Sequence, residues 1–403
     1  MLHKISVVFS LLLMLLGVIF SGCFRGGNPE LTSKNPLETA NPAEYGLDEQ
    51  EIQTIESHIL SAIDSSFISG AVALVAKNDK IIYHKAFGHS DRNKTHPMST
   101  NHIFRMASMT KPITSTAIMQ LVEKGKINLE DPVSKYIPEL ADLKVLASWQ
   151  ASDSSFTTED LHQEVTIHHL LTHTSGIPYA AFHPVARILY PQFGFNEAWT
   201  KDTITLAGNI PKLAKAPLMH QPGEKWTYGT GIDVLGYVVE IVSGLPLDEY
   251  LDKNIFSPLG MDDMAFYLDQ HKADRLVEVW FTPDLDENTR QSMLTDYPVS
   301  GAKTYFAGGA GLVGTSLDYL KFASALLNGG SLGKERILEA STVDMMFHNQ
   351  IDTLRLSKGE GFGYGGSVRV EEDEYGRNPG HLHIPVKLTH PFRAKLTHPW
   401  SME

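Results

Sequence analysis

A serine and a lysine three residues apart stand at the start of an expected helix, in the stretch Ser108-Met109-Thr110-Lys111. Residues at this spacing share one face of a helix, so the two side chains can meet. A serine hydroxyl that passes its proton to a neighbouring amine becomes a nucleophile. Ser108 and Lys111 can therefore support nucleophilic catalysis, provided that the amine is neutral.

Neutrality is a demanding condition for a lysine. The ordinary pKa of ~10.4 must fall by about 3, which corresponds to roughly 4 kcal/mol, before the amine is largely neutral at pH 7. Burial and the positive end of a helix both lower the pKa of a lysine. Without further motifs, the spacing fits an ordinary helix start equally well. It also occurs in glycine-containing stretches typical of loops, at Ser300 to Lys303 and at Ser331 to Lys334.

The elements that must position this pair can be predicted from periodicity and turn residues. Apolar residues three and four apart follow Lys111 and predict a helix with one buried stripe, with Pro112 in its first turn and an end at Gly125. Upstream, the apolar runs Gly70–Ala76 and Ile81–Phe87 flank an Asn-Asp turn and predict a β-hairpin. Because the first run is apolar throughout, we expect helices to cover the hairpin.

A tyrosine in a glycine-containing loop is a second candidate for proton transfer. Tyr228 stands just before an expected helix that ends at Gly244, with glycines on either side of Thr230. A tyrosine in such a place can relay a proton where nearby cations lower its pKa. Taken alone, the same residue is more often a packing residue.

Three other patterns are similar to known sites but are expected to be structural. His168, His169 and His173 lack an acidic partner at a metal-ligand spacing, so His173 is expected to form a hydrogen bond inside its loop. The glycine-rich run 307–316 lacks the lysine of a phosphate loop. Gly329–Gly333 matches a nucleophile elbow, but it follows an expected helix rather than a strand. The sequence therefore implies no metal and no other cofactor.

The composition is that of an acidic globular protein. The chain has 403 residues, of which 42% are hydrophobic and 20% are charged, and its formal net charge is −13 at pH 7. This charge argues against a nucleic-acid partner, because binding phosphates requires a basic surface. The expected substrate is a small molecule, or a component of the cell wall or of a lipid.

The first residues predict export. A positive start at His3-Lys4 and an apolar run over Ile5–Phe20 are typical of a signal peptide, and the run is short for a membrane-spanning helix. Cys23 is the only cysteine, which excludes an intramolecular disulfide. It follows Ser21-Gly22, which resembles the lipobox of bacterial lipoproteins, whose cysteine is lipidated. The alternative is an ordinary signal peptide with an incidental cysteine.

The lipobox resemblance implies a lipid anchor on the periplasmic face of the bacterial envelope, and Phe24 favours the outer membrane. Residues 24–45 are rich in Gly, Pro, Asn and Thr, so we expect a flexible tether between the membrane and the folded domain.

The chain as a whole resembles the serine β-lactamase-related family, which contains AmpC-type β-lactamases, D,D-peptidases and esterases of one fold. The resemblance runs from about Tyr45 to Gly380. The segments that carry it are, in order, Phe104–Lys111, Leu170–Gly176, Pro222-Gly223 with Tyr228 and Asp233–Gly236, and Gly308–Thr315. It implies an α/β (α+β) fold of the β-lactamase/transpeptidase-like type. In that fold a mostly antiparallel sheet is flanked by helices, and the site lies at the seam with an inserted helical lobe.

The same resemblance implies roles for three side chains. Ser108 is the acylated nucleophile, Lys111 its activating base and Tyr228 the second proton-transfer residue. The backbone N–H of Ser108 is half of the oxyanion hole. These roles agree with a two-step acyl transfer in which water is the final acceptor.

Two features depart from the family pattern. AmpC-type enzymes carry Tyr-x-Asn where this chain has Tyr228-Gly229-Thr230, which favours an esterase or peptidase over a β-lactamase. After Gly361–Val370 the family continues with a Lys-Thr-Gly, His-x-Gly or Trp-Gly-Gly strand, two more strands and a helix, and none of these motifs follows Gly380. We therefore expect the last strands, and with them one oxyanion donor, to be missing through truncation or a frameshift.

These inferences combine into one expected organisation. The expected parts are 1–23, a lipoprotein-type signal peptide; 24–45, a linker; 46–380, the family domain, with 46–105 and 300–380 as sheet lobe and 106–299 as helical lobe; and 381–403, an atypical tail. The predicted function is a serine hydrolase that forms an acyl-enzyme at Ser108 and cleaves a small ester or amide or a cell-wall peptide. The alternative is a catalytically impaired or non-catalytic envelope lipoprotein of the same fold.

Overall fold

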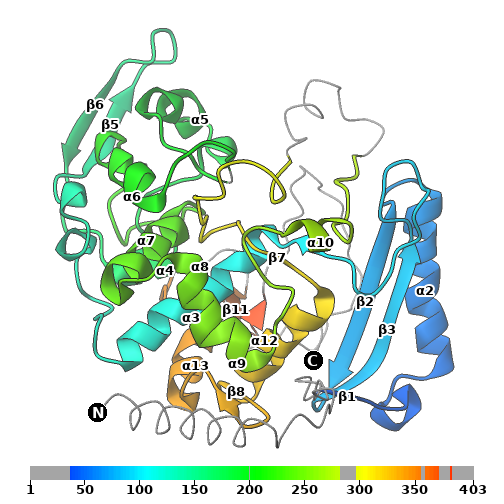
Figure 1. Ribbon diagram of the computed structural model, residues 1–403. Coiled ribbons are helices and arrows are strands. Elements are labelled where there is room, and N and C mark those ends of the chain that lie inside the picture. Colours follow the sequence, from blue (N-terminus) through cyan, green and yellow to red (C-terminus); the bar gives the residue numbers. More distant parts are fainter. Residues whose placement is uncertain (1–36, 199, 282–295, 355–358, 372–381, 384–403) are drawn as a thin grey trace, which may run out of the picture. The chain divides into compact units, whose positions relative to one another are not determined.

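The computed structural model describes residues 37–198, 200–281, 296–354, 359–371 and 382–383 (Figure 1). The predictions for the signal peptide and for Cys23 lie outside these ranges, as does the tail from 384 onward. Within the described part of the chain, no helix combines the length and the apolar character needed to span a membrane.

Helices and strands alternate irregularly along the chain. The helices are α2 (Glu49–Asp64), α3 (Thr110–Glu123), α4 (Ile167–Leu171), α5 (Ala186–Leu189), α6 (Leu206–Asn209), α7 (Gly231–Ser243), α8 (Leu247–Leu251), α9 (Ser257–Leu259), α10 (Gln270–Ala273), α12 (Ser316–Leu327) and α13 (Ala340–Phe347). The strands are β1 (Glu38–Thr39), β2 (Gly70–Lys77), β3 (Lys80–Gly88), β4 (Phe104–Arg105), β5 (Lys144–Trp149), β6 (Phe156–Asp160), β7 (Val313–Gly314), β8 (Ser331–Leu332), β9 (Glu335–Arg336), β10 (Glu360–Phe362), β11 (Ser367–Arg369) and β12 (Leu382–His383).

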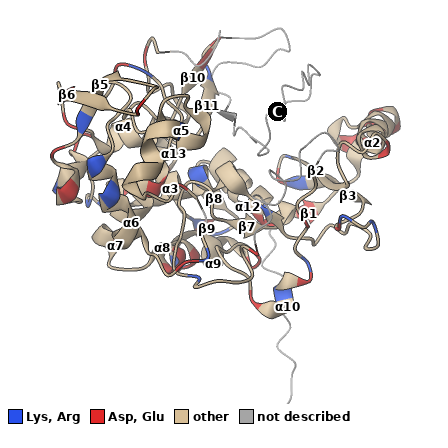
Figure 2. Cartoon of the chain, turned by 90° about the horizontal axis from the view of Figure 1, so that it is seen from above, with Lys and Arg blue, Asp and Glu red and all other residues tan. Residues whose placement is uncertain are grey.

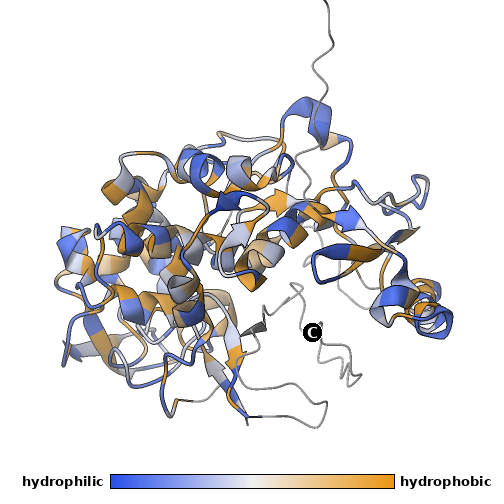
Figure 3. Cartoon of the chain, turned by 90° about the horizontal axis from the view of Figure 1, so that it is seen from below, coloured by the Kyte–Doolittle hydropathy of each residue, from blue (hydrophilic) through white to orange (hydrophobic). Residues whose placement is uncertain are grey.

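The predicted hairpin is confirmed. Strands β2 and β3 pair antiparallel around a two-residue turn, where Asn78 and Asp79 have φ angles of 51° and 59°. Asparagine and aspartate tolerate this left-handed conformation, which matches the twist of a tight hairpin. Helix α2 packs on the hairpin through its isoleucines. Its acidic residues are red in Figure 2 and its hydrophilic residues are blue in Figure 3.

Helix α3, which contains Lys111 and follows Ser108, is more deeply buried than its sequence predicts. Every residue from Thr110 to Leu121 is buried, so the expected single apolar stripe is wrong. The helix lies among α4, α7 and α8 and packs against the latter two (Figure 1). Two of its threonine hydroxyls can be buried because they bond to carbonyls: Thr114 Oγ1 donates to Gly308 O at 2.8 Å and Thr116 Oγ1 to Pro112 O at 2.9 Å.

The folded part of the chain begins earlier than expected. Leu37 is only 3% exposed, and β1 pairs in parallel with β3. A short 3₁₀ helix, Pro42–Tyr45, follows and is capped by the side chain of Asn41. The last residues of the expected tether over 24–45 are therefore part of the fold. The polar composition of residues 24–45 did not indicate the burial of Leu37 or the backbone pairing of β1 with β3.

The strands form separate sheets rather than one continuous sheet. One three-stranded sheet has the order β1-β3-β2, the other has the order β10-β11-β12, and the remaining strands form two-stranded pairs. In the part of the chain that the structure describes, no strand joins the two larger sheets.

Strand β12 lies in the segment expected to be an atypical tail. Leu382 and His383 pair antiparallel with Val368 and Ser367 of β11. The C-terminal sheet therefore reaches His383, three residues beyond the expected boundary at Gly380. The short strand precedes the first proline of the tail, Pro385, which cannot donate a ladder hydrogen bond.

Candidate active site

The serine sits in a tight turn at the start of α3. Ser108 belongs to a 3₁₀ helix, Ala107–Met109, that leads directly into α3. Its neighbour Ala107 has a φ of 45°, in the left-handed region that costs a non-glycine residue about 1–3 kcal/mol. The approach is held by the pairing of β4 with β7 and by a hydrogen bond from Met106 N to Leu312 O. The turn leaves Ser108 half-buried rather than enclosed.

The lysine is brought to the serine as predicted. Lys111 is 4% exposed, and its Nζ donates to Gly309 O at 2.7 Å, to Tyr179 Oη at 3.1 Å and to Ser108 Oγ at 3.5 Å. The serine contact is the longest of the three. The amine is thus held by a carbonyl and a phenol while it lies within reach of the serine hydroxyl.

Tyr228 reaches the same hydroxyl from a second loop. Its Oη donates to Ser108 Oγ at 2.6 Å, and Lys111 Nζ lies 4.7 Å from the centre of its ring. The structure therefore brings together the three residues that the sequence analysis selected. The loop is fixed by Gly229, where a Cβ atom would come within 1.7 Å of Ile177 O. Only glycine allows the chain to approach that carbonyl so closely.

Three further groups complete the site, and the sequence analysis assigned no role to them. Tyr179 Oη, which accepts from Lys111, donates to Asp233 Oδ2 at 3.4 Å, and Asp233 Oδ1 accepts from Gly309 N at 3.0 Å. Asp233 thus holds Tyr179 and Gly309, two of the three residues that accept hydrogen bonds from Lys111. A Cβ at Gly309 would lie 2.4 Å from Asp233 Oδ2, so this position needs glycine.

Burial sets the charge state of this network. Asp233 is 1% exposed, and burial raises its pKa to about 6, against the opposing effect of the Lys111 charge. Burial, together with Asp233, raises the pKa of Tyr179 well above its ordinary value. Tyr179 therefore remains a phenol at neutral pH and can donate to the carboxylate while accepting from the amine.

The prediction that His173 forms a hydrogen bond inside its own loop is wrong, because its side chain bonds to the loop that carries Tyr228. Its Nδ1 accepts from Gly229 N at 3.4 Å, and its ring lies 4.9 Å from the ring of Tyr228. Burial, assisted by Lys111, lowers the pKa of His173 well below its ordinary value, so the ring is neutral. His168 and His169 bind elsewhere, to Tyr364 Oη and to Thr166 N. Among the described residues, no three His, Cys, Asp or Glu side chains are grouped closely enough to hold a metal.

The remaining sequence patterns are structural where the structure describes them. Gly329–Gly333 lies in the hairpin of β8 and β9, after α12, and not between a strand and a helix as a nucleophile elbow would. Helix α12 begins at the expected cap, where Thr315 Oγ1 accepts from Asp318 N. Gly308 and its neighbours provide tight packing: a Cβ at Gly308 would lie 2.9 Å from Ile232 O.

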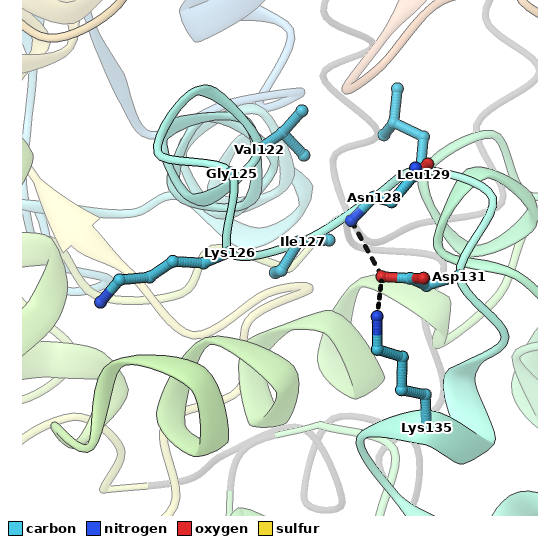
Figure 4. A pocket seen from close by; sticks show the side chains of 8 residues that line it. All are labelled: Val122, Gly125, Lys126, Ile127, Asn128, Leu129, Asp131 and Lys135. Atoms are coloured by element: carbon cyan, nitrogen blue, oxygen red, sulfur yellow. Dashed lines mark hydrogen bonds and ion pairs between the residues drawn. The ribbon is translucent and has the colours of Figure 1, made fainter.

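A separate hollow lies near the other end of α3. It has a volume of about 430 Å³ and is lined by Val122, Gly125, Lys126, Ile127, Asn128, Leu129, Asp131 and Lys135 (Figure 4). Asp131 Oδ2 accepts from Asn128 N at 3.0 Å and from Lys135 Nζ at 2.8 Å, so these polar groups bind one another. None of the residues around the serine lines this hollow.

Comparison with known proteins shows the family to which the chain belongs. The family model described as Beta-lactamase matches residues 55–382. Esterase EstB of Burkholderia gladioli is 31% identical over 349 residues, which cover 83% of each chain. Monacolin J acid methylbutanoyltransferase of Aspergillus terreus is 29% identical over 306 residues, covering 74% of this chain and 71% of that protein.

A solved structure matches over a similar extent. The structure of EstCE1, described as a hydrolase with promiscuous acyltransferase activity, has a TM-score of 0.65 and 29% sequence identity. The match covers 82% of this chain and 86% of that one. The mixed α/β fold of the β-lactamase/transpeptidase type is therefore shared with proteins that act on acyl groups.

Proposed function

Because this chain belongs to the β-lactamase family, we propose that it is a serine hydrolase that forms an acyl-enzyme at Ser108 and cleaves a carboxylic ester. One observation carries the proposal: Tyr228 Oη and Lys111 Nζ both lie within reach of Ser108 Oγ, at 2.6 and 3.5 Å. A hydroxyl flanked by two groups that can exchange protons with it is the arrangement that nucleophilic catalysis requires. The esterase and acyltransferase relatives support an enzyme of this type.

The acylation step follows from the hydrogen bonds of Lys111. Acylation requires the Lys111 amine in its neutral form, in which two N–H groups bind Gly309 O and Tyr179 Oη and the lone pair faces Ser108 Oγ. Ser108 Oγ attacks the substrate carbonyl and its proton passes to Lys111 Nζ. The backbone N–H of Ser108 stabilises the resulting oxyanion. When the tetrahedral intermediate collapses, Tyr228 Oη gives its proton to the departing alcohol.

Deacylation reverses these proton transfers. Water attacks the acyl-serine ester and gives one proton to the Tyr228 phenolate. Ser108 Oγ then leaves with the proton held by Lys111, so both groups return to their starting states. The products are one carboxylic acid and one alcohol, and the enzyme is unchanged. An alcohol in place of water would give acyl transfer, the activity that is named for two of the similar proteins.

The residue two positions after Tyr228 favours an ester over a β-lactam. Thr230 is completely buried at the start of α7, in the place where AmpC-type enzymes carry an asparagine. No amide at this position can hold the side chain of a β-lactam. A simple ester lacks such a side chain and carries a good leaving group. It therefore needs fewer binding contacts in the site.

A second candidate is a protein of this fold with impaired catalysis. It is favoured by the separation of the β1-β3-β2 sheet from the β10-β11-β12 sheet in the described residues. Loss of one oxyanion donor typically costs about 10²–10³ in rate, or about 2.7–4 kcal/mol. In this second candidate, the site binds a carbonyl compound but hydrolyses it slowly or not at all.

Hydrolysis of p-nitrophenyl acetate tests the main proposal. We expect turnover by the purified protein and a loss of at least about 10³-fold in kcat in Ser108→Ala, because the nucleophile is removed. The variant must show the same circular dichroism spectrum as the wild type. Turnover that survives in Ser108→Ala would refute the proposal, and a folded wild type without turnover would favour the second candidate.

We also propose that the protein is exported and anchored in the envelope by a lipid on Cys23, as the N-terminal sequence suggests. Incorporation of labelled palmitate into the wild type, but not into Cys23→Ala, is the expected outcome in bacterial cells. Export without label in the wild type would support the alternative of an ordinary signal peptide.

A further inference from the structure

A water-exposed phenylalanine stands beside the group that contacts the nucleophile. Phe182 is 62% exposed, and its ring centre lies 5.9 Å from that of Tyr179 and 6.4 Å from that of Tyr228. The hydroxyl of Tyr228 in turn donates to Ser108 Oγ. A large apolar ring therefore faces solvent next to the place where a substrate carbonyl must bind.

Several hydrogen bonds fix the segment that carries Phe182. Ala180, Ala181 and Phe182 form a 3₁₀ helix, and the carboxylate of Glu197 accepts from Ala180 N at 2.5 Å and from Ala181 N at 3.4 Å. Tyr179 N donates to Tyr228 O at 3.2 Å, which ties this segment to the second loop of the site. The backbone that carries the Phe182 ring is therefore fixed by hydrogen bonds.

A third ring extends the surface on the other side of Tyr228. Trp226 is half-buried, and its ring is stacked on that of Tyr228 with centres 6.1 Å apart and planes 27° apart. We call Phe182, Tyr228 and Trp226 together the aromatic wall. Phe182 is the largely exposed ring of this wall, whereas the other two are half-buried. Apolar rings bind alkyl and aromatic groups by removing them from water.

We propose that the aromatic wall binds the apolar part of the substrate, so that the preferred substrates are esters with a medium-length alkyl group or an aromatic group. This inference rests on the proposed function and adds the substrate class. Phe182 contributes most per residue, because it has the largest exposed area to lose. A fully buried methylene strengthens binding about fourfold.

A chain-length series measures this contribution. The substrates are p-nitrophenyl acetate, butyrate, hexanoate and octanoate, and the proteins are the wild type, Phe182→Ala and Ile188→Ala. Ile188 is a control because it is also exposed, at 41%, but lies on α5 outside the aromatic wall. In the wild type we expect KM to fall with chain length. In Phe182→Ala we expect the ratio of kcat/KM for hexanoate to that for acetate to fall at least about tenfold.

A second series shows which side of the ester lies on the wall. Here the acyl group stays acetyl, and the alcohol changes from ethanol to hexanol and benzyl alcohol. A loss in Phe182→Ala confined to the first series assigns the wall to the acyl group, and a loss confined to this second series assigns it to the alcohol. A ratio unchanged by Phe182→Ala in both series overturns the inference, as does an equal change in Ile188→Ala.

Binding measurements test the inference even if the wild type does not hydrolyse these esters. Ser108→Ala can be titrated with p-nitrophenyl butyrate and hexanoate by saturation-transfer NMR, alone and combined with Phe182→Ala. We expect hexanoate to bind more tightly than butyrate and to lose that advantage without Phe182. Absence of turnover in the wild type together with this binding pattern would refute the proposed function but retain the wall. Equal binding of both esters would refute the wall.

Discussion

At the scale of single residues, the site depends on two tyrosines that contact different partners. Tyr228 Oη bonds directly to Ser108 Oγ, whereas Tyr179 Oη bonds to Lys111 and Asp233. In the proposed mechanism Tyr228 transfers a proton to the leaving group and Tyr179 positions the amine. The two residues therefore provide a matched pair for mutagenesis.

We predict that Tyr228→Phe lowers kcat for ester hydrolysis by about 10²–10⁴, the usual contribution of a proton-transfer group. We expect Tyr179→Phe to cost less, because Lys111 keeps its bond to Gly309 O. Steady-state kinetics on the same ester measure both effects. Equal losses in the two variants, or a larger loss in Tyr179→Phe, would contradict the assigned roles.

The buried carboxyl of Asp233 makes stability depend on pH. Its pKa rises from 3.8 to about 6 on folding, so the folded state holds this proton more tightly than the unfolded state does. The associated stability is present in full below about pH 4 and is lost as the pH rises through about 6. Asp233→Asn keeps the shape of the side chain but cannot ionise.

We predict that Asp233→Asn gains stability relative to the wild type between pH 4 and pH 7, by roughly 3 kcal/mol. Urea unfolding of both proteins at the two pH values gives the four free energies of unfolding that are needed. Other titrating groups cancel in the difference between the proteins. A difference that stays constant from pH 4 to pH 7 would show that Asp233 has no raised pKa.

For single residues, sequence analysis identified those of the motifs but not the hydrogen-bond network around them. Ser108, Lys111 and Tyr228 could be selected because residue type, spacing and family resemblance coincide. Tyr179 could not be selected, and Gly309 lay in the quoted segment Gly308–Thr315 without an assigned role, because both act through contacts that spacing does not encode. Asp233 lay in a quoted segment, but its contact with Gly309 N becomes visible only once the loops are packed.

At the scale of elements, the loops around the serine are held by close backbone contacts. The loop that carries Tyr228 presses Gly229 against Ile177 O, and Tyr179 N bonds to Tyr228 O. The turn before α3 holds Ala107 in a left-handed conformation. The site is thus formed by tight turns that lead into helices, together with Lys111 and Asp233 in the first turns of α3 and α7.

We predict that Gly229→Ala destabilises the protein by more than about 2 kcal/mol, since the new methyl group overlaps Ile177 O and the backbone must move. Gly208→Ala is the matched control: it lies in α6, and a Cβ there would contact only Thr205 Oγ1, at 3.5 Å. We expect that variant to be neutral or slightly stabilised. Thermal unfolding compares the two, and a Gly229→Ala protein as stable as Gly208→Ala would contradict the close contact.

Element boundaries were predicted best where a local signal fixes them. The Asn-Asp turn of the hairpin and the Thr315 cap of α12 both act within a few residues, so the sequence contains the whole cause. The burial of α3 on all sides and the inclusion of Leu37 in the fold depend on distant segments. Neither could be derived from a periodic pattern in the segment itself.

At the scale of the whole molecule, the β1-β3-β2 sheet has an open edge. His89 N bonds to Ser69 O, so by alternation the backbone groups of Gly70, Val72 and Leu74 point away from β3. Among the described residues no strand pairs with this edge of β2. The run from Gly70 to Ala76 contains no charge and no proline, which are the usual protections of an edge strand.

We predict that the protein self-associates with increasing concentration through β2, and that Val72→Lys reduces this association by placing a charge on the edge strand. Gln53→Lys on the exposed surface of α2 adds the same charge elsewhere and is the control. Sedimentation velocity over a range of concentrations measures the effect. A wild type that stays monomeric throughout, or equal association in both variants, would contradict a role for this edge.

The central claim is that Ser108 is an activated nucleophile in this chain. The most direct measurement is intact-mass analysis of the purified protein after incubation with a fluorophosphonate probe, beside folded Ser108→Ala. A single adduct on the wild type that is absent from the variant is the expected result. A folded wild type without an adduct, or an adduct that remains in Ser108→Ala, would contradict the claim.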